Sequence, residues 1–477
     1  MTELKPSVGT SPAVVPWTAV SVVMVGMFMA ILDAYIVVVA GPAIRADLGA
    51  TEGQLQWILA GYQLSYAVLM ITGGRIADMY GRKRIFLLGA AVFTLSSIVC
   101  AAAPGPGTLI AARVVQGLGA ALLVPQVFAM IAVLVPERGR HQVFGVLGVV
   151  IGMASIGGQL IGGLLISADL FGAQWRAVFW VNVPIGVAMI LLAAKFVPES
   201  RVAGARRLDL PGVLALSTAL FLLTFPLIQG REAGWPWWTW ACFVASAAAF
   251  VLFAVIERRV AEAGGDPLVD LALFAQRSFT VGILLVLCVY ALLTSYYLAL
   301  SISLQEGLGM SALRAGLVYA PGAAAFFVFG MVASRVVPKY GRRVLELGSI
   351  LMVVGYLCTV VVLLSSSGFP VALVIATIVL QCAGGGLLIT PLLNTVLSGV
   401  GPAAVGMASG ALSTAQQIGG ALGVAVIGAV FFAAFQPGAD TGAAVSGHAF
   451  MMSSIANFAV AIVISVLVRQ LPAVRAK

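Results

Sequence analysis

The chain has 477 residues, of which 61% are hydrophobic and only 9% are charged, and its formal net charge is +9. Soluble globular proteins have about 45–50% apolar and about 25% charged residues, so this chain has too few charges to cover a water-facing surface. Its composition excludes a soluble globular protein and predicts an all-α integral membrane protein. The five cysteines all lie within apolar runs, so we interpret them as packing residues, without disulfide, redox or metal roles.

The apolar runs have the length that a helix needs to cross ~30 Å of hydrocarbon, about 20 residues. The first run is too long for a signal peptide and is interpreted as a retained span. In chain order the fourteen expected spans are 17–40, 54–74, 85–103, 107–134, 143–167, 177–197, 210–229, 236–256, 279–304, 313–334, 344–365, 370–395, 411–435 and 448–468. The seventh and eighth spans are expected to hold no acid or base, because Glu257 falls in the linker that follows them.

Lysine and arginine gather in every second loop between these spans. If the N-terminus is cytoplasmic, most of the 26 Lys and Arg residues fall on the cytoplasmic side, with dense groups in the loops 74–86 and 335–343. This is the positive-inside pattern, and it predicts that both termini are cytoplasmic. It also accounts for the net charge without a nucleic-acid partner.

The two basic loops are similar in sequence. Residues 74–84 read GRIADMYGRKR, residues 334–343 read SRVVPKYGRR, and Gly81 aligns with Gly341. Two more pairs keep the same order, 109–125 with 375–391 and the IGG triplets at 156–158 and 418–420. Chance similarity between Gly/Ala-rich helices is the alternative explanation.

These matches predict three parts of the chain: a six-helix bundle over 1–200, two inserted helices and a linker over 201–272, and a second six-helix bundle over 273–477. Internal repeats are typical of secondary transporters, whose substrate site lies between the halves near the bilayer midplane. We therefore expect a monomer that lies in a lipid bilayer and binds a small-molecule substrate.

Four stretches resemble motifs of a known family. The loop 74–84 matches the G-x-x-x-D-x-x-G-R-[KR] signature of the major facilitator superfamily. RVVQGLGAALLVP (113–125), LDAYIVVVAGP (32–42) and WRAVFWVNVPIG (175–186) resemble the fourth-, first- and sixth-helix motifs of its fourteen-span drug:proton antiporter family. The resemblance covers the whole chain. It implies the major facilitator fold in the inner (plasma) membrane and export of hydrophobic or cationic compounds, including antibiotics, by alternating access.

Two charged residues lie well inside expected spans, Asp33 in the first and Arg113 in the fourth. Charged residues inside a membrane are costly and usually functional. Counted from the helix ends, both lie at a similar depth, so we expect a pair or a shared polar pocket, although a static buried ion pair is the alternative. The resemblance implies that Asp33 and Arg113 couple transport to protons, with the proton gradient as energy source and no cofactor.

The loop signature and the fifth span are assigned roles by the same resemblance. In the loop, Gly74, Arg75, Asp78, Gly81 and Arg82 are expected to form a gate that contacts the other half in one state only. In the fifth span, small residues spaced four apart let two helices approach closely. This helix-packing motif comprises Gly148, Gly152, Gly158, Gln159, Gly162 and Gly163. Gln159 stands where the family motif has proline.

Spans 1, 4, 9 and 12 are expected to line the substrate cavity, as in the superfamily. Their polar and aromatic side chains are the substrate-binding candidates, and each could equally be an ordinary interhelical hydrogen-bonding residue. The candidates are Tyr35, Gln116, Gln126, Tyr290, Tyr296, Tyr297, Gln381 and Asn394.

Three other functions are alternatives to proton-coupled efflux. A proton-coupled symporter or a facilitator for a small metabolite stays open, because Gln159 departs from the antiporter motif. An enzyme would need a metal cluster or a nucleophile with its base, and the chain has only 2 histidines, far apart in sequence. A membrane sensor would need a soluble domain, and no segment is long enough to form one.

Overall fold

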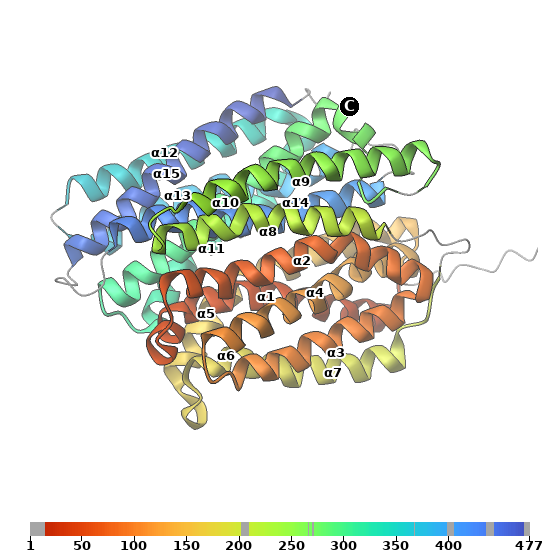
Figure 1. Cartoon of the computed structure of the whole chain (residues 1–477), viewed down its shortest axis with the longest axis horizontal. Helices are drawn as coiled ribbons and strands as arrows, with labels where there is room; N and C mark the ends of the chain where they lie inside the picture. Colours follow the sequence, from red (N-terminus) through yellow and green to blue (C-terminus); the bar gives the residue numbers. More distant parts are fainter. Residues whose placement is uncertain are drawn as a thin grey trace, which may run out of the picture.

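The computed structural model describes residues 15–201, 209–265, 267–269, 271–366, 368–397, 405–435 and 443–471. Every regular element in these residues is a helix. Figure 1 shows long helices that run side by side, with α1 to α7 on one side of the molecule and α12, α13 and α15 on the other. Helices α8 and α9 lie across the front of the junction. The all-α prediction is thus confirmed.

The elements that precede the linker begin with a long first helix. They are α1 (Trp17–Leu48), α2 (Glu52–Tyr80), α3 (Arg82–Ala101), α4 (Pro106–Leu134), α5 (Glu137–Ala168), η1 (Leu170–Gly172), η2 (Gln174–Arg176), α6 (Ala177–Trp180), α7 (Asn182–Phe196), α8 (Leu210–Glu232) and α9 (Trp237–Glu262). The remaining elements are η3 (Leu271–Ala275), α10 (Arg277–Ile302), η4 (Ser303–Gly307, a π-turn), α11 (Ala312–Tyr340), α12 (Arg342–Leu364), α13 (Val371–Leu397), α14 (Val405–Ala434) and α15 (Ala443–Gln470).

Each expected span falls on a helix, but the count of fourteen spans is not supported. Within the described residues, 12 helices are long and apolar enough to cross a membrane. Helix α2 is not among them, since it carries the polar residues Gln54, Gln56 and Gln63. The described part of α5 qualifies only as a shorter apolar helix, Gly157–Ala168.

The repeat predicted from the two basic loops is visible in their geometry. Gly81 (φ 109°) and Gly341 (φ 55°) both take positive φ between two helices, a conformation that favours glycine. Beyond each glycine, an arginine binds the segment that follows the last helix of its own half. The backbone N–H of Arg82 donates to Ser200 O at 3.0 Å, and Arg342 Nη1 donates to Leu471 O at 2.8 Å.

Helix contacts repeat as well. A Cβ on Gly89 of α3 would lie 2.9 Å from Gly119 O of α4, and a Cβ on Gly348 of α12 would lie 2.7 Å from Gly384 O of α13. The sequence alignment paired Gly119 with Gly385, whereas the contacts make Gly119 equivalent to Gly384. The alignment is therefore shifted by one residue in this region. These contacts support two related halves, and the boundaries 1–200, 201–272 and 273–477 stay a prediction.

Two antiparallel helix pairs join the halves. Helix α2 packs along α14, where Thr414 Oγ1 donates to Ala67 O at 3.3 Å. Helix α5 packs along α11, where a Cβ on Gly163 would lie only 2.5 Å from Ala312 O. At the same end of the molecule, Arg45 of α1 pairs with Glu306 of η4 at 3.0 Å. The halves are therefore in close contact at the end where the α1–α2 turn lies.

The inserted helices form a peripheral layer. Helix α8 packs on α9 and contacts both α2 and α14. In the most apolar 18-residue stretch of each helix, only 17% of α9 is buried inside the protein, against 72% of α1. Helix α9 therefore presents most of its apolar surface outward. The expectation that the insert holds no internal acid is wrong, because α9 continues to Glu262 and Glu257 is fully buried.

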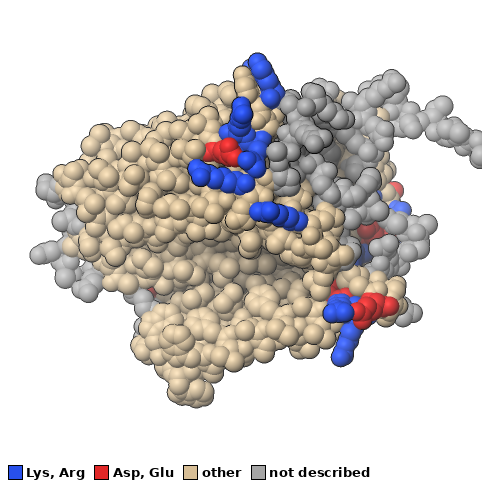
Figure 2. Space-filling view, turned by 90° about the horizontal axis from the view of Figure 1, so that it is seen from above, with Lys and Arg blue, Asp and Glu red and all other residues tan. Residues whose placement is uncertain are grey.

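Charged side chains gather toward one end of the molecule. Figure 2 shows Lys and Arg grouped there on the visible face, and a tan, uncharged surface over most of the rest. Exposed basic residues at the junction of α11 and α12 include Arg335, Lys339 and Arg343. A large uncharged surface with charges at its end is what a bilayer-embedded protein needs, and which end is cytoplasmic stays a prediction.

The contact between α2 and α4 yields a stability prediction. A Cβ on Gly73 would lie 2.3 Å from the backbone oxygen of Ala121, whereas a Cβ on Gly74 would have Pro125 as its nearest neighbour, at 3.9 Å. Gly73→Ala should therefore force the helices apart and cost about 1–3 kcal/mol. Thermal unfolding of the purified protein measures it, and Gly74→Ala, which makes the same helix-propensity change, is the control. Equal melting temperatures for the two variants would contradict this packing.

Candidate functional site

A buried carboxylate lies at the meeting point of α1, α4 and α7. Asp33 of α1 is 0% exposed, and all its hydrogen-bond donors come from other helices. Its Oδ1 accepts from Gln116 Nε2 at 3.0 Å and from Asn182 Nδ2 at 2.8 Å. Its Oδ2 accepts from Arg113 Nη1. Both oxygens are thus occupied, as a buried carboxylate requires.

The arginine is equally well enclosed. Arg113 is 1% exposed, and its Nε donates to Ile58 O of α2 at 3.1 Å. Its Nη1 also donates to Gln116 Oε1 at 2.6 Å, and the guanidinium lies 4.2 Å from the centre of the Tyr62 ring. Cation–π contacts are strongest where the cation has lost its water. The predicted pairing of Asp33 with Arg113 is present, and its role in proton coupling stays a prediction.

Sequence reasoning missed two members of this network. Asn182, fully buried at the start of α7, binds Asp33 but has no partner for its Oδ1 among the described residues. Ser97 of α3 accepts from Gln116 Nε2 at 2.8 Å. Asn182 belongs to the stretch WRAVFWVNVPIG, so the motif signalled it, whereas no pattern signalled Ser97. Gln116, a substrate-binding candidate, hydrogen-bonds to both Asp33 and Arg113, and its role in substrate binding stays a prediction.

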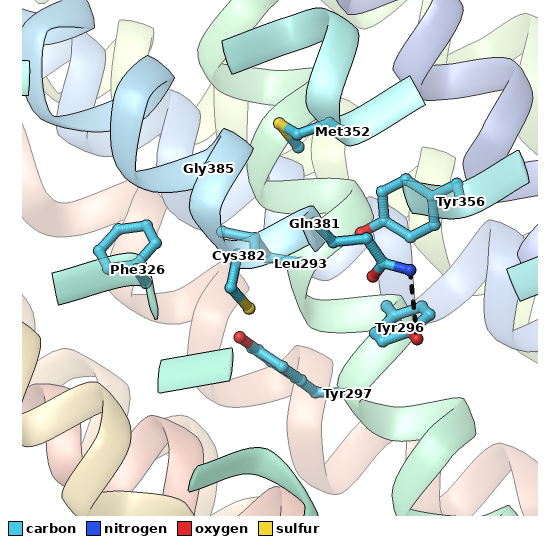
Figure 3. Close-up of a pocket in the computed structure, with 9 residues that line it drawn as sticks. All are labelled: Leu293, Tyr296, Tyr297, Phe326, Met352, Tyr356, Gln381, Cys382 and Gly385. Atoms are coloured by element: carbon cyan, nitrogen blue, oxygen red, sulfur yellow. Dashed lines mark hydrogen bonds between the residues drawn. The ribbon is translucent and has the colours of Figure 1, made fainter. Parts of the chain in front are cut away.

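A small pocket lies in the second half of the chain, among α10, α11, α12 and α13. Its walls are mainly aromatic and apolar, and Figure 3 shows the side chains converging on it. The lining residues are Leu293, Tyr296, Tyr297, Phe326, Met352, Tyr356, Gln381, Cys382 and Gly385. The pocket offers about 20 Å³ to the centres of water-sized molecules, room for roughly one or two waters. An organic substrate needs a pocket of about 300 Å³ or more, so this pocket is too small to hold one as it stands.

The wall of this pocket differs from the expected one. Helices α1 and α4 do not line it, whereas α11 and α12 contribute Phe326, Met352 and Tyr356. Three expected candidates do line it: Tyr296, Tyr297 and Gln381. Gln381 Nε2 donates to Tyr296 OH at 3.4 Å (Figure 3) and to Thr359 Oγ1 at 2.8 Å.

The other candidates lie elsewhere. Tyr35 of α1 meets Tyr297 edge-on at 6.1 Å between ring centres, and so links the first half to the pocket wall. Tyr290 is half-buried on α10 beside the core. Gln126 is buried and donates to Gly73 O at 3.1 Å, which is a helix-packing role. Asn394 lies outside the residues whose side chains the structure describes.

The gate residues meet at the turn between α2 and α3. Asp78 Oδ1 accepts from Arg82 Nε at 3.0 Å and from Arg82 Nη2 at 2.9 Å, so the predicted ion pair forms across the turn. A Cβ on Gly81 would lie 2.7 Å from the Glu199 carboxylate, whereas a Cβ on Gly74 would make only an ordinary contact with Pro125 at 3.9 Å. Arg75 Nη2 donates to Pro267 O in the linker.

Glu199 is a partner that the sequence did not reveal. Its Oε1 accepts from the backbone N–H of Lys83 at 3.0 Å, so it binds the start of α3 after the turn. The gate turn is thus attached to the segment that follows α7 in its own half. Release of the turn during a transport cycle stays a prediction.

The described glycines of the α5 motif do allow close helix contacts. A Cβ on Gly158 would lie 2.7 Å from Tyr35 Cβ, and a Cβ on Gly162 would lie 2.9 Å from Ile36 Cγ1, so both face α1. Gly163 faces α11. Gln159 is 3% exposed, and neither polar atom of its side chain has a partner among the described residues. Gly148 and Gly152 lie outside the residues whose side chains are described.

The model of the Major Facilitator Superfamily matches residues 23–424. The chain belongs to this superfamily. It is 38% identical to a protein of Streptomyces coelicolor described as "Probable actinorhodin transporter", over 89% of this chain and 74% of that one. It is 37% identical to the cephamycin export protein CmcT of Amycolatopsis lactamdurans, over 88% and 85% of the two chains.

A third relative of this major facilitator protein is the puromycin resistance protein pur8 of Streptomyces alboniger, 33% identical over 87% of this chain and 81% of that one. Among solved structures, a bacterial homologue of the lysosomal transporter Spinster, in an inward-facing and occupied conformation, is similar with a TM-score of 0.68. It is 16% identical and covers 97% of each chain. At that identity the similarity shows the fold alone, and it confirms the expected major facilitator fold.

The charge network yields a prediction with an internal control. Arg113→Met leaves the Asp33 carboxylate buried without its cation, which costs about 3–5 kcal/mol. The purified variant should therefore unfold at a clearly lower temperature than the wild type. In the double variant Asp33→Asn, Arg113→Met no charge remains, so most of the stability should return. Additive losses in the double variant would show that the two side chains do not stabilise each other.

Proposed function

We propose that this superfamily member is a fourteen-span, proton-coupled exporter of hydrophobic or cationic organic compounds that works by alternating access. The observation that carries the proposal is the buried Asp33–Arg113 pair in a chain whose relatives are named for antibiotic export and resistance. A buried acid that can exchange its proton is what a proton-driven transporter needs. The energy source is the proton gradient across the plasma membrane, with both termini in the cytoplasm.

Helices α2 and α5 complete the fourteen spans. They have 29 and 32 residues, and at ~1.5 Å per residue either exceeds a ~30 Å hydrocarbon layer. Each packs between the halves, α2 against α14 and α5 against α11. The polar residues of α2 are compatible with a span because Gln56 and Gln63 are buried inside the protein.

Asp33 is surrounded by groups that suit both of its protonation states. As a carboxylate it accepts from Arg113, Gln116 and Asn182. As a carboxylic acid it must donate one hydrogen bond, and the side-chain oxygen of Asn182, which has no partner among the described residues, can accept it if the amide turns so that Oδ1 takes the place of Nδ2. Asn182 is therefore a positioning residue that satisfies Asp33 in either state, once its amide turns over.

Exchange then follows from competition for Asp33. A proton weakens the attraction between Asp33 and Arg113, whereas a cationic substrate nearby favours the charged carboxylate and releases the proton. The aromatic pocket of Tyr296, Tyr297 and Tyr356 provides ring faces for flat or cationic compounds. Tyr35 lies two residues after Asp33 on α1 and contacts Tyr297 of the pocket wall, so it connects the pocket to the helix that carries Asp33. The pocket must widen to admit a substrate, which is the opening step of the cycle.

Uptake by symport is the second candidate, and Gln159 in place of the motif proline favours it. Purified protein in liposomes with a pH-sensitive dye inside separates the two. Export by exchange moves protons against the direction of the added compound, whereas symport moves them with it. Puromycin is a suitable compound because one relative is a puromycin resistance protein.

Asp33→Asn should abolish puromycin-driven proton movement, because an amide cannot exchange a proton, while leaving membrane insertion intact. The dye signal in liposomes measures it, with Asp169→Asn in the exposed loop after α5 as the control. Full proton movement in Asp33→Asn would refute the role of this residue.

Asp78→Asn should slow turnover at least several-fold without weakening substrate binding. The substitution removes the ion pair with Arg82 that fixes the gate turn, and a partly exposed pair of this kind contributes only about 1 kcal/mol or less to stability. Transport rates in liposomes and binding by tryptophan fluorescence separate the two effects. A weaker binding constant with an unchanged maximal rate would argue against a gating role.

A further inference from the structure

The inserted helices contain a buried pair of acids outside the network described above. Asp209 precedes α8 and is 6% exposed, and Glu257, near the end of α9, is 0% exposed. A Cβ on Gly212 would lie 2.4 Å from Asp209 Oδ2 and 2.4 Å from Glu257 Oε1. The two oxygens therefore lie close to the same point and are neighbours of each other.

One oxygen of each carboxyl group is well bound and the other is not. Asp209 Oδ1 accepts from the backbone N–H of Gly212 at 3.0 Å, and Glu257 Oε2 accepts from that of Val269 at 2.9 Å. The facing oxygens, Asp209 Oδ2 and Glu257 Oε1, have no hydrogen-bond partner among the described residues. Two unpartnered, buried acceptors that face each other are a costly arrangement if both groups are charged.

We propose that Asp209 and Glu257 form a second proton-binding site, in which one proton is shared between their facing oxygens. The proton turns the repulsive contact into a hydrogen bond, with one carboxyl group as donor and the other as acceptor. No covalent step is involved. The site goes beyond the proposed function, because it lies in the insert and does not depend on the direction of transport.

The surroundings link this site to the gate turn. Arg75 of α2 acts electrostatically on Glu257 and also donates to Pro267 O, two residues before the Val269 N–H that binds Glu257. On α9, Arg258 is exposed and pairs with Glu262 at 2.8 Å, so it does not neutralise the acids. Loss of the shared proton leaves a second negative charge near Arg75. The charge on the pair and the charge of Arg75, an arginine of the gate signature, therefore influence each other.

Infrared pH titration of the purified full-length protein tests the site, since a protonated carboxyl group has a C=O stretching band that a carboxylate lacks. The titration is made in the double variant Asp33→Asn, Arg113→Met, so that Asp33 contributes nothing and no buried charge is left without its partner. We expect a protonated-carboxyl band that persists at neutral pH. Glu257→Gln and Asp209→Asn should each abolish it, because one proton is shared. Both amides keep an oxygen that can accept the backbone N–H bond, so the fold is preserved.

Glu262→Gln is the matched control, since Glu262 lies on the same helix and is exposed, and it should keep the band. No band at neutral pH, or a band that survives in both Glu257→Gln and Asp209→Asn, would overturn the proposal. Replacing choline chloride with sodium chloride at constant pH tests whether a metal cation, in place of a proton, binds between the two acids. A band that disappears in sodium alone would assign the pair to a metal cation and overturn the shared proton.

Discussion

The ion pair between Asp33 and Arg113 is the interaction on which the first half of the structure depends. Each charge is costly inside a membrane, and the cost is offset only because four helices supply partners. Helix α1 provides the acid, α4 the base, α2 the Ile58 carbonyl and α7 the amide of Asn182. The pair therefore fixes how these helices meet in this structure.

The second half has no counterpart to this pair in its described residues, and it is built around aromatic side chains. Tyr296 meets Tyr297 and Tyr356 edge-on, and Gln381 is hydrogen-bonded among them. Val379 stands where the repeat alignment places the equivalent of Arg113. The two halves thus have similar helix arrangements with different chemistry, one built around a buried ion pair and the other around aromatic side chains. The contact of Tyr35 with Tyr297 joins them.

The fold and part of the site were predictable because their signals are local in the sequence. Span length, basic loops and repeated glycines identified the helices, and the depth of Asp33 and Arg113 predicted their pairing. The pocket wall was less accessible, since Phe326 and Tyr356 are ordinary apolar and aromatic residues of α11 and α12. Only packing between those helices brings them to Tyr297. The expected count of fourteen spans is not supported at α2. Its glutamines lower the hydropathy of the helix as exposed polar residues would, although Gln56 and Gln63 are buried.

The sequence alone determined that lipid surrounds most of this protein and that the chain is helical. The hydrophobicity and the length of each apolar run are local properties that can be counted along the chain. It also determined which residues carry charge where charge is costly. The tertiary structure decided which groups answer those charges. Three such pairs come from distant parts of the chain: Asn182 with Asp33, Glu199 with Gly81, and Asp209 with Glu257. Hydrogen bonds and ion pairs depend on ångström distances between helices, and those distances are fixed only when the helices pack.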